Sequence, residues 1–254
     1  MDLMEAKDQV LSYLKPARTE VLKWFRGNYS VELKADQSPV TIADKKVEEA
    51  LRRKISRDFP SHGIIGEEFG DENPQSEYVW TIDPIDGTLS FIQGLPLFAT
   101  LIALLHRGKP VLGVIALPAL GEVAWAVAGH GAFAGGQRLQ VSAQKPLSEA
   151  LVGTGDRYCF KMQKRLGFLD QLHKNARIVR TYPDAFGHLM AARGAIDLMV
   201  DPIAYIWDFA PCKILVEEAG GVFANFSGNK ASIQEGSALS GNPALILEVK
   251  KLLR

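Results

Sequence analysis

The stretch that decides how this chain folds is Trp80-Thr81-Ile82-Asp83-Pro84-Ile85-Asp86-Gly87-Thr88. An apolar strand ends there and delivers Asp83 and Asp86 into a turn. Pro84 fixes its own φ and lacks an N–H, and Gly87 permits a positive φ or a close backbone approach. Carboxylates on a rigid turn suit Mg²⁺, which takes few protein ligands and shares its other positions with water and phosphate. The stretch therefore predicts a metal-assisted phosphate site, and the alternative is a turn whose aspartates cap backbone amides.

Further carboxylates occur at other turns of the chain. The adjacent Glu67 and Glu68 follow the apolar pair Ile64-Ile65, and such neighbours favour either a solvated loop or a shared cation. Asp208 precedes an apolar helical segment, where it would be a good N-cap. In the alternative interpretation, the N-terminus of that helix faces the site and its dipole favours an anion. Asp44 either complements the dipole of its own helix or holds a water by hydrogen bonding.

Hydrophobic periodicity predicts two helices first, over 2–25 and 41–59, with a kink or division at Pro16 and a cap formed by Thr41 and Asp44. Residues 63–128 then carry short β-rich runs separated by Gly and Pro, which predicts neighbouring antiparallel strands. From about residue 145, strands alternate with helices. The predicted elements there are strands 151–153, 177–179, 197–200 and 222–224 and helices 160–173, 184–193, 207–219 and 243–253.

This pattern predicts a layered fold of the α/β (α+β) class. We expect an N-terminal α+β lobe over 1–144, which carries the metal-binding loops, and a C-terminal α/β lobe over 145–254, which completes the active site. No repeat or flexible linker separates the lobes, so we expect one compact unit.

Composition excludes several classes of protein. The 254 residues include 29 basic and 29 acidic side chains, so no net field attracts nucleic acid or an anionic membrane. The longest apolar run, over 95–105, is too short for a membrane span, and the N-terminus has no signal-peptide pattern. The 2 cysteines form neither a disulfide framework nor a zinc finger. We therefore expect a cytoplasmic protein with no nucleic-acid or membrane partner.

The acidic motifs also carry a resemblance to a known family. Gly66-Glu67-Glu68, the stretch 83–88, and Trp207-Asp208 with 218–221 resemble the inositol monophosphatase family of Mg²⁺-dependent phosphatases. The likeness runs from about Lys34 to Gly228. It implies a five-layer αβαβα sandwich, a homodimer, a small phosphorylated metabolite as substrate, and two or three Mg²⁺ ions per site.

The resemblance also assigns roles to individual residues. It implies that the metal ligands are Glu67, Asp83, Asp86, Asp208 and the carbonyl of Ile85. The catalytic residues would be Thr88 and Asp44, which orient a metal-bound water, and Glu67, which assists its deprotonation. The amides of Gly87 and Thr88 would hold the phosphate. The implied substrate-binding residues are Asp86, Gly87, Thr88, Asp184, Asp201 and Asp208.

Within the family, the sequence looks most similar to the histidinol-phosphatase branch. The segments that carry this likeness are 38–41, 62–70, 94–98, 101–105 and 110–115. Three positions depart from the inositol branch in the same direction. Leu89-Ser90 replaces its usual Thr-Asn, Tyr182-Pro183-Asp184 replaces its small Gly-Ser/Thr-Ala run, and Asp201 replaces a Glu that contacts an inositol hydroxyl.

Asp184 is the predicted specificity residue. Its carboxylate could pair with the ammonium of L-histidinol phosphate, a group that an uncharged polyol lacks. The alternative is that Asp184 merely caps the helix that follows it. Pro183 departs from the Gly-Asp that histidinol-phosphatases often carry. We expect His188, one turn beyond Asp184, to hold an ordinary helical position.

The sequence therefore predicts Mg²⁺-dependent hydrolysis of a phosphate monoester by a metal-activated water. L-Histidinol phosphate, an intermediate of histidine biosynthesis, is the first expected substrate and inositol 1-phosphate is the alternative. Fructose 1,6-bisphosphate and adenosine 3′,5′-bisphosphate stay open. A protein of another class, a regulatory protein that binds metal or phosphate without turnover, is the non-enzymatic alternative. An aspartyl-phosphate mechanism fits less well, because it needs two aspartates separated by one residue rather than two.

Overall fold

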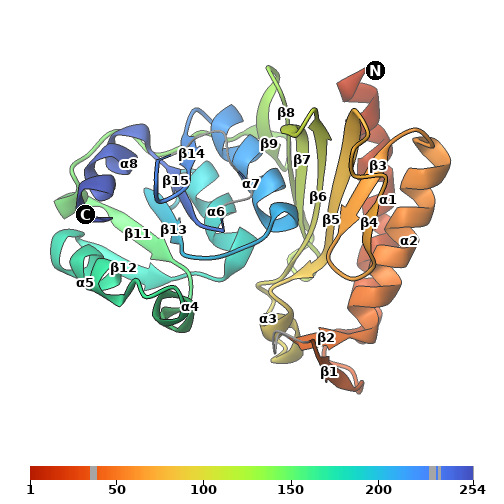
Figure 1. The fold of residues 1–254 in the computed structure, drawn as a ribbon, viewed down its shortest axis with the longest axis horizontal. Coiled ribbons are helices and arrows are strands. Elements are labelled where there is room, and N and C mark those ends of the chain that lie inside the picture. Colours follow the sequence, from red (N-terminus) through yellow and green to blue (C-terminus); the bar gives the residue numbers. More distant parts are fainter. Residues whose placement is uncertain (35–38, 229–232, 234–235, 254) are drawn as a thin grey trace.

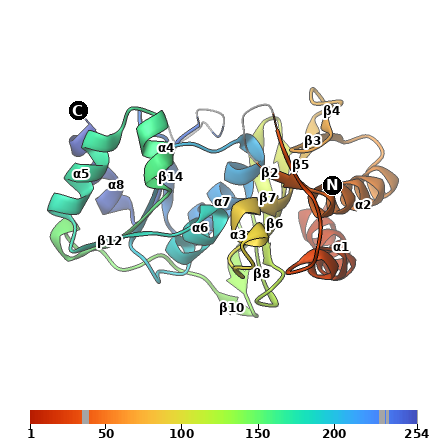
Figure 2. The same cartoon turned by 90° about the horizontal axis from the view of Figure 1, so that it is seen from below.

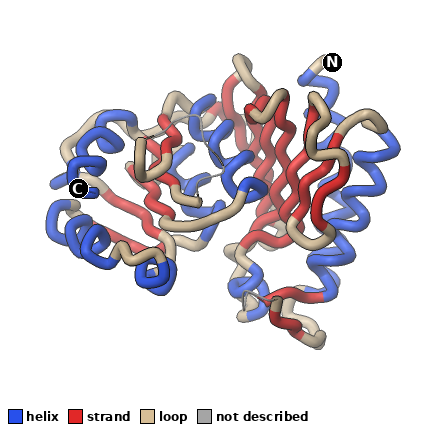
Figure 3. The backbone as a smooth tube through the Cα atoms, viewed as in Figure 1, coloured by secondary structure: helices blue, strands red, loops and turns tan. Residues whose placement is uncertain are grey.

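The fold is a sandwich of five layers, seen in a computed structural model that describes residues 1–34, 39–228, 233 and 236–253. From right to left in Figure 1, the layers are helices, a large sheet, helices, a small sheet and helices. Figure 2 shows the same succession from below, and Figure 3 shows the two groups of strands separated by helices. The expected αβαβα sandwich is confirmed. Ser38, in the segment 38–41 quoted above, lies outside the described residues.

The first layer consists of helices α1 (Leu3–Trp24) and α2 (Ile42–Asp58). Asp2 caps α1 by accepting the backbone N–H groups of Met4 and Glu5. Thr41 and Asp44 form the predicted capping box of α2. Pro16 lies inside α1, which continues through it, so of the predicted kink or division the division does not occur.

The large sheet has eight strands in the order β10-β9-β8-β7-β6-β5-β3-β4. From β5 to β10, neighbouring strands are antiparallel, as predicted, whereas β3 runs parallel to β5. The strands are β3 (Gly63–Gly66), β4 (Gly70–Glu72), β5 (Tyr78–Asp86), β6 (Ala99–His106), β7 (Lys109–Leu117), β8 (Glu122–Val127), β9 (Gly131–Ala134) and β10 (Gln137–Arg138).

Both faces of the large sheet are buried, which explains why its central strands are apolar throughout. In β6, Leu101 and Ala103 belong to the core between the two sheets. Ile102 and Leu104 belong to the core under α1 and α2. Because side chains alternate along a strand, a continuous apolar run serves two cores at once.

The middle layer contains α6 (Asp184–Ala192) and α7 (Ile206–Glu218). A Cβ atom on Gly113 of β7 would stand 2.9 Å from the Cα of Pro211 in α7. Since that distance is too short for real atoms, glycine at this position lets the α7 backbone lie directly on the large sheet. This close approach brings the start of α7 to the end of β5.

The small sheet has five strands in the order β12-β11-β13-β15-β14. It consists of β11 (Leu151–Thr154), β12 (Ile178–Thr181), β13 (Leu198–Asp201), β14 (Val222–Ala224) and β15 (Ala238–Gly241). The outer helices α4 (Arg157–Met162), α5 (Leu166–Asn175) and α8 (Pro243–Val249) cover its other face, with short 3₁₀ turns at Leu147–Glu149 and Lys250–Leu253. The single helix predicted over 160–173 is divided, and Lys164 between α4 and α5 has a φ of 55°.

A small hairpin of β1 (Val31–Leu33) and β2 (Pro39–Thr41) lies beside α3 (Thr88–Ile92), below the large sheet in Figure 1. The hairpin brings residue 34 near the end of β5. Within the described residues, no helix combines the length and apolar composition needed to cross a bilayer.

Candidate active site

The end of β5 contains a bulge that determines where its two aspartates point. Asp83 pairs with Leu101 of β6 and Asp86 pairs with Ala99, so the register shifts between them. In a regular strand, residues three apart would face opposite sides of the sheet. The bulge removes that separation, and both carboxylates reach the same acidic cluster. Ile85 stabilises the turn by donating its backbone N–H to Asp83 Oδ1 at 2.9 Å.

Asp208 joins these aspartates from the first turn of α7. One carboxylate oxygen from each of Asp83, Asp86 and Asp208 lies within 4.8 Å of the others. Asp208 is the third residue of α7 rather than its N-cap, so the predicted N-cap position is wrong, although its side chain does help to cap the helix. Its carboxylate accepts the backbone N–H of Tyr205 at 2.7 Å, which fixes it at the start of the helix.

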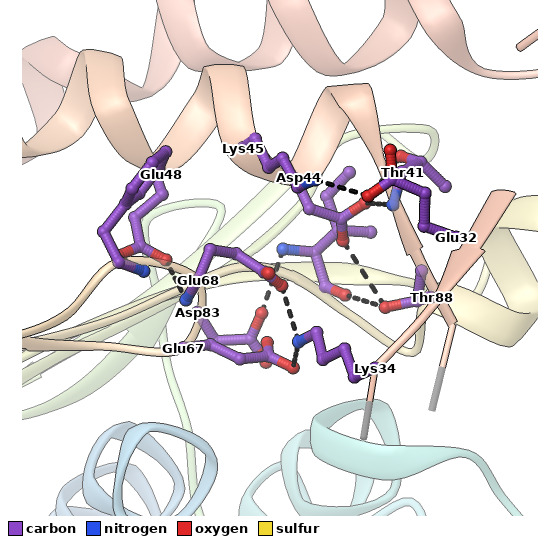
Figure 4. A network of polar contacts seen from close by, with 12 residues as sticks. Glu32, Lys34, Thr41, Asp44, Lys45, Glu48, Glu67, Glu68, Asp83 and Thr88 are labelled. Carbon is purple, nitrogen blue, oxygen red and sulfur yellow. Dashed lines mark hydrogen bonds and ion pairs between the residues drawn. The ribbon is translucent and has the colours of Figure 1, made fainter. Parts of the chain in front are cut away.

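Glu67 lines the same cavity and lies close to Asp83, whose pKa its charge raises. Its backbone N–H donates to the carbonyl of Ile82 at 3.2 Å, which holds the loop after β3 against β5. Lys34 Nζ lies 2.7 Å from a carboxylate oxygen of Glu67 and 2.7 Å from one of Glu68 (Figure 4). The structure thus shows a cation shared between the two glutamates, one of the two interpretations that the sequence offered.

An ion pair between α2 residues binds the backbone of this loop. Glu48 of α2 is fully buried and accepts the backbone N–H groups of Glu68 at 2.8 Å and Phe69 at 3.3 Å. Arg52 pairs with Glu48 at 2.7 Å and also donates to the carbonyl of Gly70. Because both ends of the pair hold backbone groups of the loop, they fix the position of Glu67.

Asp44 and Thr88 form a polar contact with one another (Figure 4). Thr88 Oγ1 lies 3.1 Å from the carbonyl of Ile85 and 3.4 Å from Asp44 Oδ1. The other Asp44 oxygen accepts the hydroxyl of Thr41 at 2.5 Å and its backbone N–H at 2.8 Å. One Asp44 oxygen therefore caps α2 while the other faces Thr88, so the two roles considered for this residue are compatible.

The electrostatics of the cluster favour a cation. Burial and the neighbouring carboxylates raise the pKa values of Asp83 and Asp86 well above the ordinary range. Burial also raises the pKa of Asp208 to about 8 and that of Asp44 to about 6. Buried like charges disfavour ionisation of one another, and a bound cation would remove that cost.

Gly87 and Asp184 meet where the two halves of the molecule come together. Gly87 has a φ of 78°, and a Cβ atom there would stand 2.9 Å from Asp184 Oδ2. Both uses predicted for this glycine, a positive φ and a close approach, are therefore present. Asp184 itself has a φ of 49° and follows the N-cap residue Pro183, so it does not cap α6. Ala185 donates its N–H to Asp86 Oδ2 at 2.9 Å, which joins α6 to the acidic cluster.

A second cavity of about 490 Å³ adjoins the cluster and shares Asp86 and Asp208 with it. Asp184, Asp201 and His188 lie in its wall, together with Tyr158 and other residues of α4, α6 and α7. Among the described residues that line it, there is no lysine or arginine. Burial, together with the charges of Asp201 and Asp156, raises the pKa of Asp184 to about 7. We call this space the acidic side cavity.

The structure brings the predicted residues together in two groups. A cavity of about 350 Å³ is lined by Glu67, Asp83, Ile85, Asp86, Gly87, Thr88 and Asp208, whereas Asp184 and Asp201 line the acidic side cavity. Asp44 lies behind Thr88. Two residues that contact the glutamate loop were not predicted: Lys34, although it marks the start of the family likeness, and Glu48, whose buried helical position gave no signal. His188, for which an ordinary helical position was expected, lies on α6 and is buried in the wall of the side cavity.

Comparisons with known proteins agree with this geometry. A model of the inositol monophosphatase family matches residues 6–252. The chain is 41% identical to a histidinol-phosphatase of Chlorobaculum parvum over 87% of this chain and 85% of that protein. It is 31% identical to an inositol-1-monophosphatase of Rhizobium meliloti over 89% of this chain and 87% of that protein. The sequence is thus nearer to the first of these two relatives.

A solved structure has the same fold. The extragenic suppressor protein suhB of Bartonella henselae superposes with a TM-score of 0.91 at 27% identity, over 98% of each chain. This chain therefore belongs to the inositol monophosphatase family and is a phosphoric monoester hydrolase.

Proposed function

We propose that this phosphatase hydrolyses L-histidinol phosphate with the help of Mg²⁺. The observation that carries the substrate assignment is the acidic side cavity, which presents Asp184 and Asp201 beside the acidic cluster and, among its described lining residues, no basic side chain. Such a wall suits an alcohol that carries a positive charge. The identity to a relative named histidinol-phosphatase supports the same choice.

The donors of the acidic cluster fit Mg²⁺. They are carboxylate oxygens, with the carbonyl of Ile85 in the same cavity, and hard oxygen ligands are those that Mg²⁺ prefers. Asp83, Asp86, Asp208 and Glu67 would hold the ions. When bound, Mg²⁺ lowers the pKa of a coordinated water and neutralises charge on the phosphate. The raised pKa values of the aspartates reflect a site that is electrostatically incomplete without a cation.

The chain's own residues would place the attacking water and the phosphate. Thr88 Oγ1 lies between the Ile85 carbonyl and Asp44, so the Asp44 carboxylate can accept its proton while Thr88 accepts a proton from water. Glu67 would assist deprotonation of the water. The amides of Gly87 and Thr88 would bind phosphate oxygens, because the positive φ of Gly87 turns the chain at the start of α3. The scissile bond would then lie at the mouth of the acidic side cavity.

The leaving alcohol would occupy the acidic side cavity. Asp184 lies against Gly87, close to where the phosphate would bind, and Asp201 lies in the same wall. An ammonium beside the phosphate ester can therefore reach Asp184. A neutral inositol ring would gain weaker hydrogen bonds there, because a hydrogen bond between charged groups is about twice as strong as a neutral one.

Phosphate release from L-histidinol phosphate and myo-inositol 1-phosphate, measured side by side with Mg²⁺ and with EDTA, tests the proposal. We expect hydrolysis that requires Mg²⁺ and a higher kcat/KM for L-histidinol phosphate, which would place the enzyme in histidine biosynthesis. A higher kcat/KM for the inositol ester would overturn the substrate assignment, and full activity in EDTA would overturn the role of the metal.

The remaining expectations stay predictions. They are the homodimer, the cytoplasmic location, the lack of nucleic-acid and membrane partners, and the division into lobes 1–144 and 145–254.

A further inference from the structure

His188 is held firmly on one side of its ring. It lies on α6 with 2% of its surface exposed, and its Nδ1 is 2.7 Å from Ser240 Oγ of β15. The ring packs edge-to-face with Phe209, with ring centroids 5.9 Å apart, and also lies against Phe223. These contacts fix the plane of the imidazole and therefore the direction of its other nitrogen.

The other nitrogen, Nε2, is buried and has no hydrogen-bond partner among the residues that the structure describes. It lies 3.7 Å from Asp201 Oδ2, slightly beyond hydrogen-bond distance. Asp201 Oδ1 accepts the backbone N–H of Ile203 at 3.3 Å, so one oxygen of this carboxylate is anchored and the other faces the histidine. A buried unpaired imidazole nitrogen costs free energy, which a small movement of Asp201 toward His188 would recover.

We propose that His188 is a positioning residue for substrate specificity: its Nε2–H orients Asp201 so that the carboxylate binds the cationic part of the leaving alcohol. The inference rests on the proposed function and adds to it the second anionic contact of the acidic side cavity. In the tautomer that carries the ring proton on Nε2, Nδ1 accepts the hydroxyl proton of Ser240, and the 2.7 Å contact is compatible with this. Since His188 is almost fully covered, it acts on the substrate through Asp201.

This arrangement provides two carboxylates that can each bind a cationic group of the substrate. Asp184 lies beside Gly87, near the phosphate, whereas Asp201 ends β13 and lies in the same wall as His188. A substrate with two separate cationic groups, an ammonium near the ester and a protonated ring further away, would engage both carboxylates. A neutral polyol would gain little from either charge.

The experiment measures kcat/KM for L-histidinol phosphate and for myo-inositol 1-phosphate in the Mg²⁺-loaded enzyme and its variants. His188→Leu removes both ring nitrogens, whereas His188→Gln keeps an N–H donor near the position of Nε2. Asp201→Asn and the double variant with His188→Leu complete a double-mutant cycle. His173→Leu, which changes an exposed histidine of α5, is the matched control.

We expect His188→Leu to lower the ratio of the two kcat/KM values about tenfold, the size of one hydrogen bond to a charged group. His188→Gln should restore most of the ratio, and His173→Leu should leave it unchanged. The double variant should show no loss beyond that of Asp201→Asn, because coupled residues are non-additive. If His188→Leu does not fold, Ser240→Ala tests the same contact, with a smaller fall in the ratio.

The outcomes distinguish a failure of the role of His188 from a failure of the proposed substrate. An equal loss for both esters, or independent effects of His188→Leu and Asp201→Asn, would show that His188 serves packing alone. A wild-type enzyme that prefers the inositol ester would overturn the proposed substrate and this inference together. A wild-type preference for L-histidinol phosphate with an unchanged ratio in His188→Leu would overturn this inference alone.

Discussion

The acidic cluster and the acidic side cavity share a wall but are held in different ways. In the cluster, each aspartate accepts a backbone N–H: Asp83 from Ile85, Asp86 from Ala185 and Asp208 from Tyr205. In the side cavity, Asp184 sits at a positive φ, and Asp201 accepts the backbone N–H of Ile203 only at 3.3 Å while its other oxygen faces the side chain of His188 at 3.7 Å. Most substitutions leave a backbone N–H donor in place, whereas a substitution of His188 removes its side-chain contact. Under the proposed function, the cluster serves chemistry common to all substrates, whereas the side cavity is held by side chains that can change with the substrate.

Loss of a charge in the cluster should produce the largest effect and affect all substrates alike. We expect Asp86→Asn to lower kcat/KM for both phosphate esters at least about a hundredfold, since metal sites supply several kcal/mol of transition-state stabilisation. The amide oxygen can still accept the Ala185 N–H, so the melting temperature without metal should not fall. Asp71→Asn on the exposed strand β4 is the control. Near-normal turnover by Asp86→Asn would remove this residue from the metal site.

Loss of a charge in the side cavity should separate the substrates instead. Asp184→Asn keeps a residue that tolerates a positive φ and removes the charge. We expect kcat/KM for L-histidinol phosphate to fall about tenfold or more, as for other charged hydrogen bonds, with a much smaller fall for the inositol ester. Steady-state kinetics with both esters, with Asp170→Asn on the surface of α5 as control, measures this. A parallel fall for both esters would contradict the ammonium contact.

Loosening the support of Glu67 should change metal affinity more than the maximal rate. Glu48→Gln removes the charge that pairs with Arg52 and weakens the hold on the backbone of Glu68. We expect the half-saturating Mg²⁺ concentration to rise severalfold, about 1 kcal/mol of binding free energy, with kcat at saturating Mg²⁺ close to wild type. Glu49→Gln, which breaks an exposed ion pair with Arg53, is the matched control.

A titration of kcat against Mg²⁺ concentration for both variants decides the outcome. A fall in kcat that Mg²⁺ cannot reverse, or an equal shift in Glu49→Gln, would contradict a positioning role for Glu48.

The smallest expected effect is on stability, and it depends on pH. Without metal, burial raises the pKa values of Asp44 to about 6, Glu68 to about 7 and Asp208 to about 8. The folded state then binds more protons than the unfolded state, so stability present below about pH 4 is lost as pH rises toward 8. Mg²⁺ should therefore raise the melting temperature by roughly 5 °C more at pH 8 than at pH 5.

Thermal melts with Mg²⁺ and with EDTA across that pH range measure this difference. Asp86→Asn should reduce the difference between the Mg²⁺-induced rises in melting temperature at pH 8 and pH 5, because the variant has one ionised group fewer in the cluster. A Mg²⁺ shift that is the same at both pH values would contradict the link between metal binding and these carboxylates.

Local sequence predicted much of the fold because apolar periodicity is a local property. The helix of 42–58 and its capping box, the strands from 78 to 127 and the alternation after 150 all follow from neighbouring residues. The interruption between α4 and α5 was missed because a positive φ at Lys164, which is not a glycine, leaves no mark in the pattern. Strand β15 was missed because the sequence of 238–241 contains no local signal that it pairs between β13 and β14.

By itself, the sequence determined the carboxylates of the acidic cluster and the glycine that must stand beside them. Those residues lie in short contiguous motifs, and the conformational demands of Pro84 and Gly87 are intrinsic to the residues. The tertiary structure alone decided that a bulge turns Asp83 and Asp86 to one side, that Lys34 and Glu48 hold the glutamate loop, and that His188 faces Asp201. These contacts join segments far apart in the chain, and their geometry depends on packing, which no local pattern encodes.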